Sequence, residues 1–212
     1  MNPRSTPRSK PPSMRMRMKE EARAAILDAA EQVLAEQGQA ARMDDIAARV
    51  GVSVGTLYNY FEDRQQLLAA LRDVRGRELL ALLDAELERS LRTPYRARLH
   101  GFLRCILEHS RTHFRLFSLL LEDSLRRDAS REGDLDHHLE LWREAALRLE
   151  HLGQQGVKEG ALRPEDAPHY PALLLDMMQG VVLRQLLAKQ PAPADELLAP
   201  LLRCFLEGAA PR

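Results

Sequence analysis

Aromatic residues are scarce in this chain of 212 residues, at 5% of the sequence, and no run of alternating β-branched residues stands out. Leu and Ala dominate instead, which favours helices over sheets. The sequence therefore predicts an all-α fold of about nine helices, in a chain long enough to bury a hydrophobic core.

Long apolar runs and paired cysteines are also lacking. No stretch approaches the ~20 apolar residues that a membrane span needs, and the basic N-terminus has no apolar segment after it, so we expect no secretory signal. Two cysteines, Cys105 and Cys204, lie far apart in sequence. This spacing favours reduced thiols in a cytoplasmic protein over a disulfide framework, with a redox switch between the two as an alternative.

Net charge is absent as well, since 31 basic residues balance 31 acidic ones. The charge is nevertheless unevenly distributed, because six basic residues precede the first acidic residue: Arg4, Arg8, Lys10, Arg15, Arg17 and Lys19. Residues 1–17 therefore read as a basic arm that is disordered when free. Such an arm either follows a phosphate backbone or minor groove, or serves only as a solubilising tail.

Two short helices joined by a tight turn are predicted within residues 42–64. Apolar residues in Asp44–Val50 recur at helical spacing. Gly51 is expected to end this helix in the left-handed conformation, and Ser53 to cap the next one. The buried side of the second helix is then formed by Val54, Leu57 and Phe61.

The outward face of the second helix carries no long charged side chain, only Gly55, Thr56 and Asn59. Small polar groups suit a close approach to base edges in the DNA major groove, which is about one helix wide. Tyr58 and Tyr60 flank this face, where their hydroxyls can reach phosphates. The alternative is an ordinary helical hairpin whose tyrosines are half-buried core.

The segment ARAAILDAAEQVLAEQG…MDDIAARVGVSVGTLYNYFEDRQQLL resembles the DNA-binding domain of TetR/AcrR-type transcriptional regulators. The resemblance runs from Ala22 to Leu68 and includes GVS, GTLY and YF, the core of the family pattern. It implies a helix-turn-helix domain of three helices over residues 18–66, followed by a helical bundle for ligand binding and dimerisation over residues 67–212.

Two positions depart from the family pattern. Arg42 stands where the family usually has Ser or Thr, so Asp44 and Asp45 are expected to satisfy the helix end instead. Arg64 replaces the usual Lys and keeps a phosphate contact available. The residues expected to contact DNA are Lys19, Arg42, Ser53, Val54, Gly55, Thr56, Tyr58, Asn59, Tyr60 and Arg64.

Helical periodicity and breakers organise the rest of the chain. The first helix is expected over 18–37, and a long helix capped by Asp63 over 63–91. This long helix would link the DNA-binding domain mechanically to the bundle. Proline- and glycine-containing breaks separate further helices at 95–112, 113–126, 134–158, 167–189 and 194–208.

The last two of these helices are apolar on more than one side, so each needs cover on both. A second copy of the chain in a symmetric dimer is one source of that cover, and a central position within a monomer is the alternative. The predicted dimer interface consists of Met178, Val181, Val182, Gln185, Leu198, Leu201, Leu202 and Phe205.

A ligand pocket between the bundle helices is the least determined feature. The candidates to line it are Phe102, Cys105, His109, Phe114, Phe117, Trp142, Met177 and Met178, and each of them also suits plain core. His109 and His113 lie one helical turn apart, but with no third ligand identifiable we expect hydrogen-bonding or surface roles. The adjacent His137 and His138 point in different directions. We therefore expect neither a metal nor another cofactor.

Three classes of function remain to be compared. The sequence offers no nucleophile elbow, glycine-rich phosphate loop or HExxH motif, so we expect no enzyme. A helical interaction or scaffold protein explains the apolar C-terminal helices and leaves the small polar face unexplained. The preferred hypothesis is a ligand-responsive regulator, a repressor released from a palindromic DNA operator by a small molecule.

Overall fold

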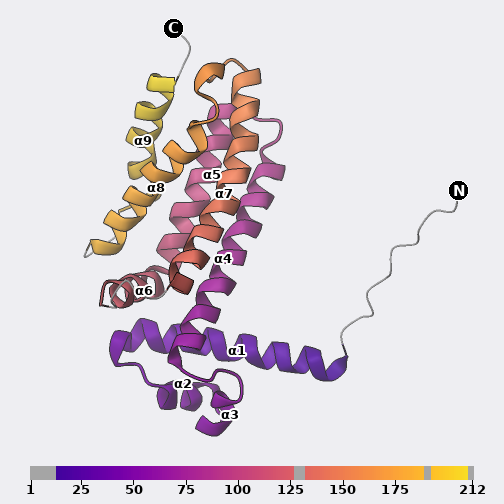
Figure 1. Cartoon of the computed structure of the whole chain (residues 1–212), viewed down its shortest axis with the longest axis vertical. Helices are drawn as coiled ribbons and strands as arrows, with labels where there is room; N and C mark the ends of the chain where they lie inside the picture. Colours follow the sequence, from indigo (N-terminus) through magenta and orange to yellow (C-terminus); the bar gives the residue numbers. More distant parts are fainter. Residues whose placement is uncertain (1–12, 127–131, 189–191, 210–212) are drawn as a thin grey trace, which may run out of the picture. The chain divides into compact units, whose positions relative to one another are not determined.

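The computed structural model describes residues 13–126, 132–188 and 192–209. Within these ranges the regular structure is entirely helical, which confirms the all-α prediction (Figure 1). The helices are α1 (Met14–Gln37), α2 (Met43–Val50), α3 (Val54–Tyr58), α4 (Arg64–Arg89), α5 (Tyr95–Thr112), α6 (Phe114–Arg126), α7 (Glu132–Lys158), α8 (Tyr170–Leu187) and α9 (Ala194–Ala209), with 3₁₀ turns at Gly38–Ala40 and Pro164–Asp166. No helix in these ranges has the length and apolarity needed to cross a membrane.

The chain divides into two compact units, with the boundary between Leu67 and Leu68. Helices α1 to α3 and the first turn of α4 belong to the first unit. The rest of α4 and helices α5 to α9 form the second. Helix α4 is therefore continuous from one unit into the other, as the hypothesis of a mechanical link requires.

In the first unit, α1 packs against α2, and α2 against α3. The most deeply buried residues of its core are each at most 2% exposed: Ile26, Leu27, Ala30, Val33, Leu34, Ile46, Ala47, Leu57, Phe61 and Leu67. Two polar contacts fix the outside of this core. Arg49 of α2 donates to Glu36 of α1 over 3.1 Å, and the Arg23 guanidinium lies 5.0 Å from the centroid of the Phe61 ring.

Helix α1 begins earlier than the sequence indicated. The predicted start was residue 18, but the helix starts at Met14, because the Ser13 side chain accepts the backbone N–H of Met16 over 3.3 Å and caps it. Residues 14–17, assigned to the disordered arm, are thus the first turn of a helix. Residues 1–12 of that arm lie outside the described residues.

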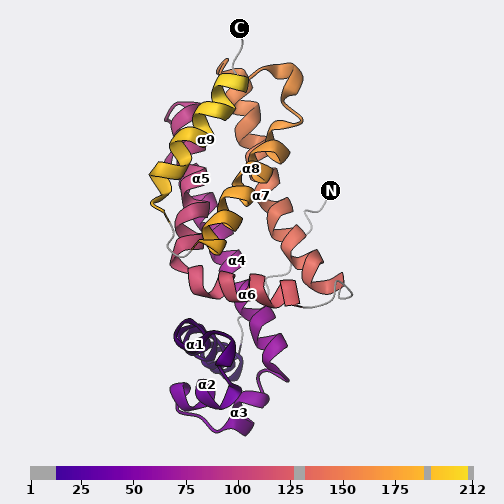
Figure 2. The ribbon, with the colours of Figure 1, turned by 90° about the vertical axis from the view of Figure 1, so that its left-hand side faces the viewer.

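In the second unit, α5 is the central helix and packs against α6, α7, α8 and α9, as Figure 2 shows for α9 and α8 around it. Helices α5 and α7 run antiparallel, and a polar cluster joins their ends. The buried guanidinium of Arg98 donates to Gln155 over 2.8 Å and pairs with Glu159. The backbone N–H of Tyr95 also donates to Glu159, over 2.9 Å.

An ion pair joins α4 to α7, and Gly76 of α4 lies close to α7. Arg148 binds Asp84 through two nitrogens, over 2.7 and 2.9 Å. This bidentate pair lowers the pKa of Asp84, chiefly through the hydrogen bond. Further towards the N-terminus of α4, a Cβ on Gly76 would meet the Leu141 side chain at 3.5 Å, an ordinary van der Waals distance. Leu82 of α4 is 49% exposed although its side chain is apolar.

Five of the eight residues predicted for the dimer interface are buried within the protomer. Met178, Leu198, Leu201, Leu202 and Phe205 are at most 7% exposed and form part of the protomer's own core. Val181, Val182 and Gln185 are half-buried. The sequence does not reveal this burial, because α8 and α9 are rich in Leu on every side, so periodicity does not tell which side faces inward.

Candidate DNA-binding surface

The turn between α2 and α3 forms as its sequence predicts. Gly51 has φ 80°, a backbone conformation that residues with a Cβ rarely adopt. Its N–H ends α2 by donating to the carbonyl oxygens of Ala47 and Ala48. Ser53 then caps α3, since its hydroxyl oxygen accepts the N–H of Thr56 over 3.1 Å. The same oxygen lies 2.8 Å from the Thr56 hydroxyl, so both side chains are held at the start of α3.

The N-terminus of α2 is satisfied without a Ser or Thr cap. The backbone N–H of Arg42 donates to the Asp45 carboxylate over 3.0 Å, and the Arg42 guanidinium pairs with Asp44 over 3.3 Å. Both aspartates therefore act at the helix end, as predicted. The Arg42 side chain remains 76% exposed, at the edge of the hairpin.

The next helix is capped in the same local way. Asp63 accepts the N–H of Gln66 over 2.7 Å, and the Gln66 side chain accepts the N–H of Glu62 over 2.7 Å. These reciprocal bonds set the direction in which α4 leaves the hairpin. The first helical residue, Arg64, is half-buried, and its Nη2 atom is buried within the protein.

All ten residues predicted to contact DNA lie in the first unit. Six are exposed: Lys19, Arg42, Ser53, Gly55, Tyr58 and Asn59. Four are half-buried: Val54, Thr56, Tyr60 and Arg64. Helix α3 is shorter than predicted, because it ends at Tyr58 and leaves Asn59 as its C-terminal cap.

Gly55 is not required by the fold of the hairpin. Its φ is not positive, and among the described residues an added Cβ would meet only Ser53 Oγ, at 3.9 Å. Glycine inside a helix costs about 1 kcal/mol relative to alanine. We call Gly55, Thr56, Tyr58 and Asn59 the α3 surface. This surface is uncharged, and it is low in the sense that Gly55 has no side chain although the protein has room for one there.

The second unit contains a separate candidate site, an open groove of about 900 Å³ between α4 and α5. We call it the α4–α5 groove. Of the eight residues predicted to line a pocket, only Cys105 and His109 lie there. Phe102 and Met178 are fully buried in the core, while Trp142 and Met177 pack against it. Phe114 borders a small separate cavity beside Leu186, and the Phe117 ring contacts those of His109 and His113.

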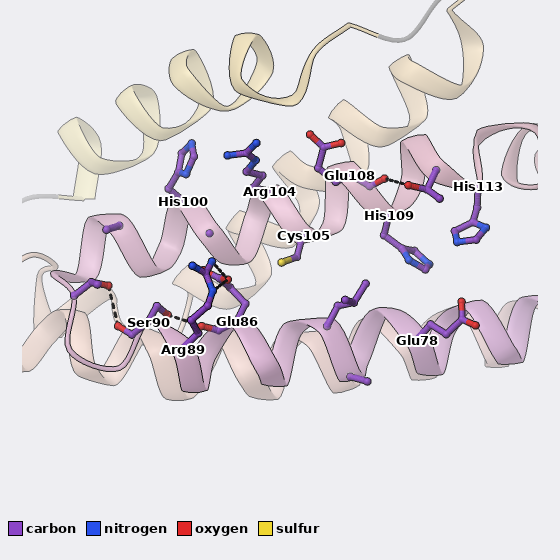
Figure 3. A pocket seen from close by; sticks show the side chains of 16 residues that line it. Glu78, Glu86, Arg89, Ser90, His100, Arg104, Cys105, Glu108, His109 and His113 are labelled. Atoms are coloured by element: carbon purple, nitrogen blue, oxygen red, sulfur yellow. Dashed lines mark hydrogen bonds and ion pairs between the residues drawn. The ribbon is translucent and has the colours of Figure 1, made fainter.

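Figure 3 shows which side chains point into the groove. Glu86 and Arg89 extend from α4 towards α5, and Cys105 and His109 extend from α5 towards α4, whereas Arg104 points away. Burial raises the pKa of the Cys105 thiol, and the Glu86 carboxylate adds to this effect. The thiol therefore stays neutral and acts as a small apolar group.

Sequence reasoning missed Glu86, because a carboxylate on an amphipathic helix is normally solvated. A local signal was available in Gly101, which lies inside α5 and makes room for that carboxylate.

A metal site finds no support in the described part of the chain, which contains no group of three or more His, Cys, Asp or Glu side chains suited to a metal ion. The rings of His109 and His113 lie in contact, with centroids 4.7 Å apart. The side chains of His137 and His138 lie outside the described residues.

Comparison with known proteins supports the interpretation of the first unit. Residues 26–71 match the family model described as bacterial regulatory proteins, tetR family. An uncharacterized HTH-type transcriptional regulator, YhgD of Bacillus subtilis, is 25% identical over 183 residues, which cover 85% of this chain and 92% of that protein. The HTH-type transcriptional repressor Rv3405c of Mycobacterium tuberculosis is 42% identical over 83 residues, or 39% of this chain and 42% of that protein.

Solved structures share the fold. A TetR transcription regulator from Haloarcula marismortui superimposes with a TM-score of 0.72 at 22% identity, over 91% of this chain and 100% of that chain. The helix-turn-helix of the first unit, its match to the family model and the shared fold agree with one another. Residues 26–71 are therefore a DNA-binding domain of the tetR family of bacterial regulatory proteins, and the chain as a whole shares the fold of a TetR transcription regulator.

Proposed function

We propose that this regulator is a repressor that binds a palindromic operator as a homodimer in the cytoplasm, and that a small molecule bound to its second unit releases it. The observation that carries the DNA-binding part is the low, uncharged α3 surface with its open space at Gly55. The relative from Mycobacterium tuberculosis is an HTH-type transcriptional repressor, which supports the direction of regulation.

In this proposal the α3 surface enters the major groove. Gly55 lets the helix backbone approach the base edges, and Thr56 and Asn59 discriminate between bases through hydrogen bonds. The hydroxyl of Tyr58, which is 47% exposed, and the guanidinium of Arg64 bind phosphates on the groove walls. Phosphate contacts set affinity and its salt dependence, whereas base contacts set the preferred sequence.

The proposed dimer uses the outer face of α8. Three leucines on this face are exposed in the single chain: Leu173 by 51%, Leu183 by 44% and Leu187 by 66%. Gly180 lies between them in sequence, and the described residues leave open space around it, which permits two helices to approach closely. A twofold axis through this face would bury the leucines of both copies and place two α3 helices on a palindrome.

Helix α4 carries the proposed coupling. It begins at Arg64 in the DNA-binding unit, and Glu78, Leu82 and Glu86 further along it line the α4–α5 groove. A ligand that occupies the groove only in one arrangement of α4 shifts the population towards that arrangement. Release from DNA then reflects the ligand's different affinities for two states of the protein.

A mobility-shift titration with the DNA that flanks the gene tests the proposal. We expect a discrete complex containing two copies of the chain per palindrome, which persists when unrelated duplex is added in excess. A chain that binds flanking and unrelated DNA equally, or ignores both in low-salt buffer, would contradict the proposed function.

A further inference from the structure

Glu86 is an unusual lining residue for an open groove, because it is only 8% exposed. Burying a carboxylate is costly unless a counter-ion and hydrogen bonds compensate for the lost water. Arg89, one turn along α4, supplies that compensation by donating to Oε2 through Nε over 3.0 Å, and also through Nη2.

The two members of this ion pair are exposed to very different degrees. The Glu86 side chain is 9% exposed, whereas the Arg89 side chain is 77% exposed. Arg89 therefore reaches the carboxylate from the solvent side of the groove. Because most of the Arg89 side chain is already hydrated, breaking this ion pair costs Arg89 little. A cation that enters the groove can therefore take the place of Arg89 at the carboxylate.

Gly101 leaves room for the Glu86 carboxylate beside α5. A Cβ at this position would lie 2.1 Å from Glu86 Oε1, closer than any real contact. Glycine within a helix costs about 1 kcal/mol, and here its effect is to leave space for a charged group beside the groove. The oxygen nearest to α5, Oε1, is thus a different atom from the one that Arg89 binds.

The remaining lining of the groove is mixed. Ala81, Leu82 and Ala97 are apolar, whereas the polar lining residues include Glu78, Ser90, Thr93, His100, Glu108 and Thr112. Ala81 and Leu82 line the groove from α4. The neutral Cys105 thiol lies on the α5 side, and the adjacent rings of His109 and His113 follow it towards the end of α5 (Figure 3). Arg104 is turned towards Asp195 of α9, at 4.0 Å, and so does not add positive charge to the interior. A volume of about 900 Å³ suits a molecule of drug size.

We propose that the α4–α5 groove binds an organic cation with a flat, apolar body, and that Glu86 is its counter-ion. The cation displaces Arg89 from the buried carboxylate, and the apolar body lies along Leu82 and Cys105 towards the His109 and His113 rings. This inference rests on the proposed function in one respect, namely that occupation of the groove is what regulates operator binding.

Three probes with the same body and different charge test the charge preference by calorimetry at pH 7: biphenylmethylamine, biphenylmethanol and biphenylcarboxylate. We expect the amine to bind at least about tenfold more tightly than the other two, which corresponds to roughly 1.4 kcal/mol. Equal binding of the three, tighter binding of the carboxylate, or no binding of the amine at millimolar concentration overturns the inference.

Two variants and one control locate the effect. Glu86→Gln is isosteric and should remove the tenfold preference while it leaves the affinity for the alcohol unchanged. Gly101→Ala retains the charge but forces the flexible carboxylate end to move, so it should also weaken amine binding. Glu108→Gln is the matched control, because Glu108 lies on the rim, points away from α4 and pairs with Arg111. Amine binding that survives Glu86→Gln contradicts the assignment of the counter-ion.

Thermal melting of each variant without probe confirms that it folds. Operator binding measured without probe tests the proposed function separately. A chain that binds the operator but not the amine keeps the function and loses this inference. A chain that binds the amine through Glu86 but binds no duplex keeps the groove site and loses the function.

Discussion

Replacement of Gly55 by leucine tests whether this glycine is required for folding or for DNA binding. The described residues leave open space around this position, with Ser53 Oγ 3.9 Å from an added Cβ as the nearest atom, and the backbone φ is not positive. Leucine has the better helix propensity, so Gly55→Leu should stabilise the first unit by about 0.5–1 kcal/mol. Operator affinity should nevertheless fall at least about tenfold, since the side chain holds α3 away from the base edges.

Hydrogen exchange of the α2 amides measures the local stability, and fluorescence anisotropy with a labelled operator measures the affinity. Gly208→Leu is the matched control, because Gly208 is exposed in α9 with open space around it and lies outside the DNA-binding unit. The control should be stabilised similarly and bind the operator normally. If Gly55→Leu bound the operator as the wild type does, a glycine at position 55 would not be needed for the close approach of α3 to DNA, and the proposed role of the α3 surface would be refuted.

Three further predictions concern charge, assembly and pH. Arg64→Ala should weaken binding to all duplexes and reduce the slope of log affinity against log salt by about 1; an unchanged slope contradicts the phosphate contact. Leu183→Arg should convert the proposed dimer to a folded monomer in sedimentation, whereas a dimer that persists moves the interface elsewhere. Because Arg148 lowers the pKa of Asp84 in the folded chain, this pair stabilises the fold above the unfolded pKa of about 3.9, and the contribution disappears as pH falls through the lowered value. Arg148→Met should therefore lose stability at neutral pH and converge with the wild type in acid.

The hairpin could be predicted from sequence because its determinants are local. The left-handed Gly51, the Ser53 cap and the Asp63 cap each act within four residues of the chain, and all three form as expected. Local rules of this kind do not depend on how distant helices pack. The same rules missed the Ser13 cap, which adds a turn to the start of α1.

The α4–α5 groove and the exposed face of α8 could not be predicted in the same way. Which side of α8 faces inward depends on how the helix is rotated about its axis against α5 and α7. Because leucines occur on all sides of α8, its sequence does not indicate this rotation. Leu82 and Glu86 reverse the usual rule that apolar side chains are buried and charged ones exposed, since the structure leaves the leucine in the groove and buries the carboxylate. The space left by Gly101 and the ion pair with Arg89 together explain the burial of Glu86, and the tertiary fold brings Gly101 and Glu86 together.

The most direct test of the account is an NMR titration of the labelled chain with its own flanking palindrome. The account predicts that the amide signals of Gly55, Thr56 and Asn59 shift or broaden first and most, at salt concentrations where an unrelated duplex leaves them unchanged. Amide signals of α3 that stay in place while the operator binds through another surface would contradict it.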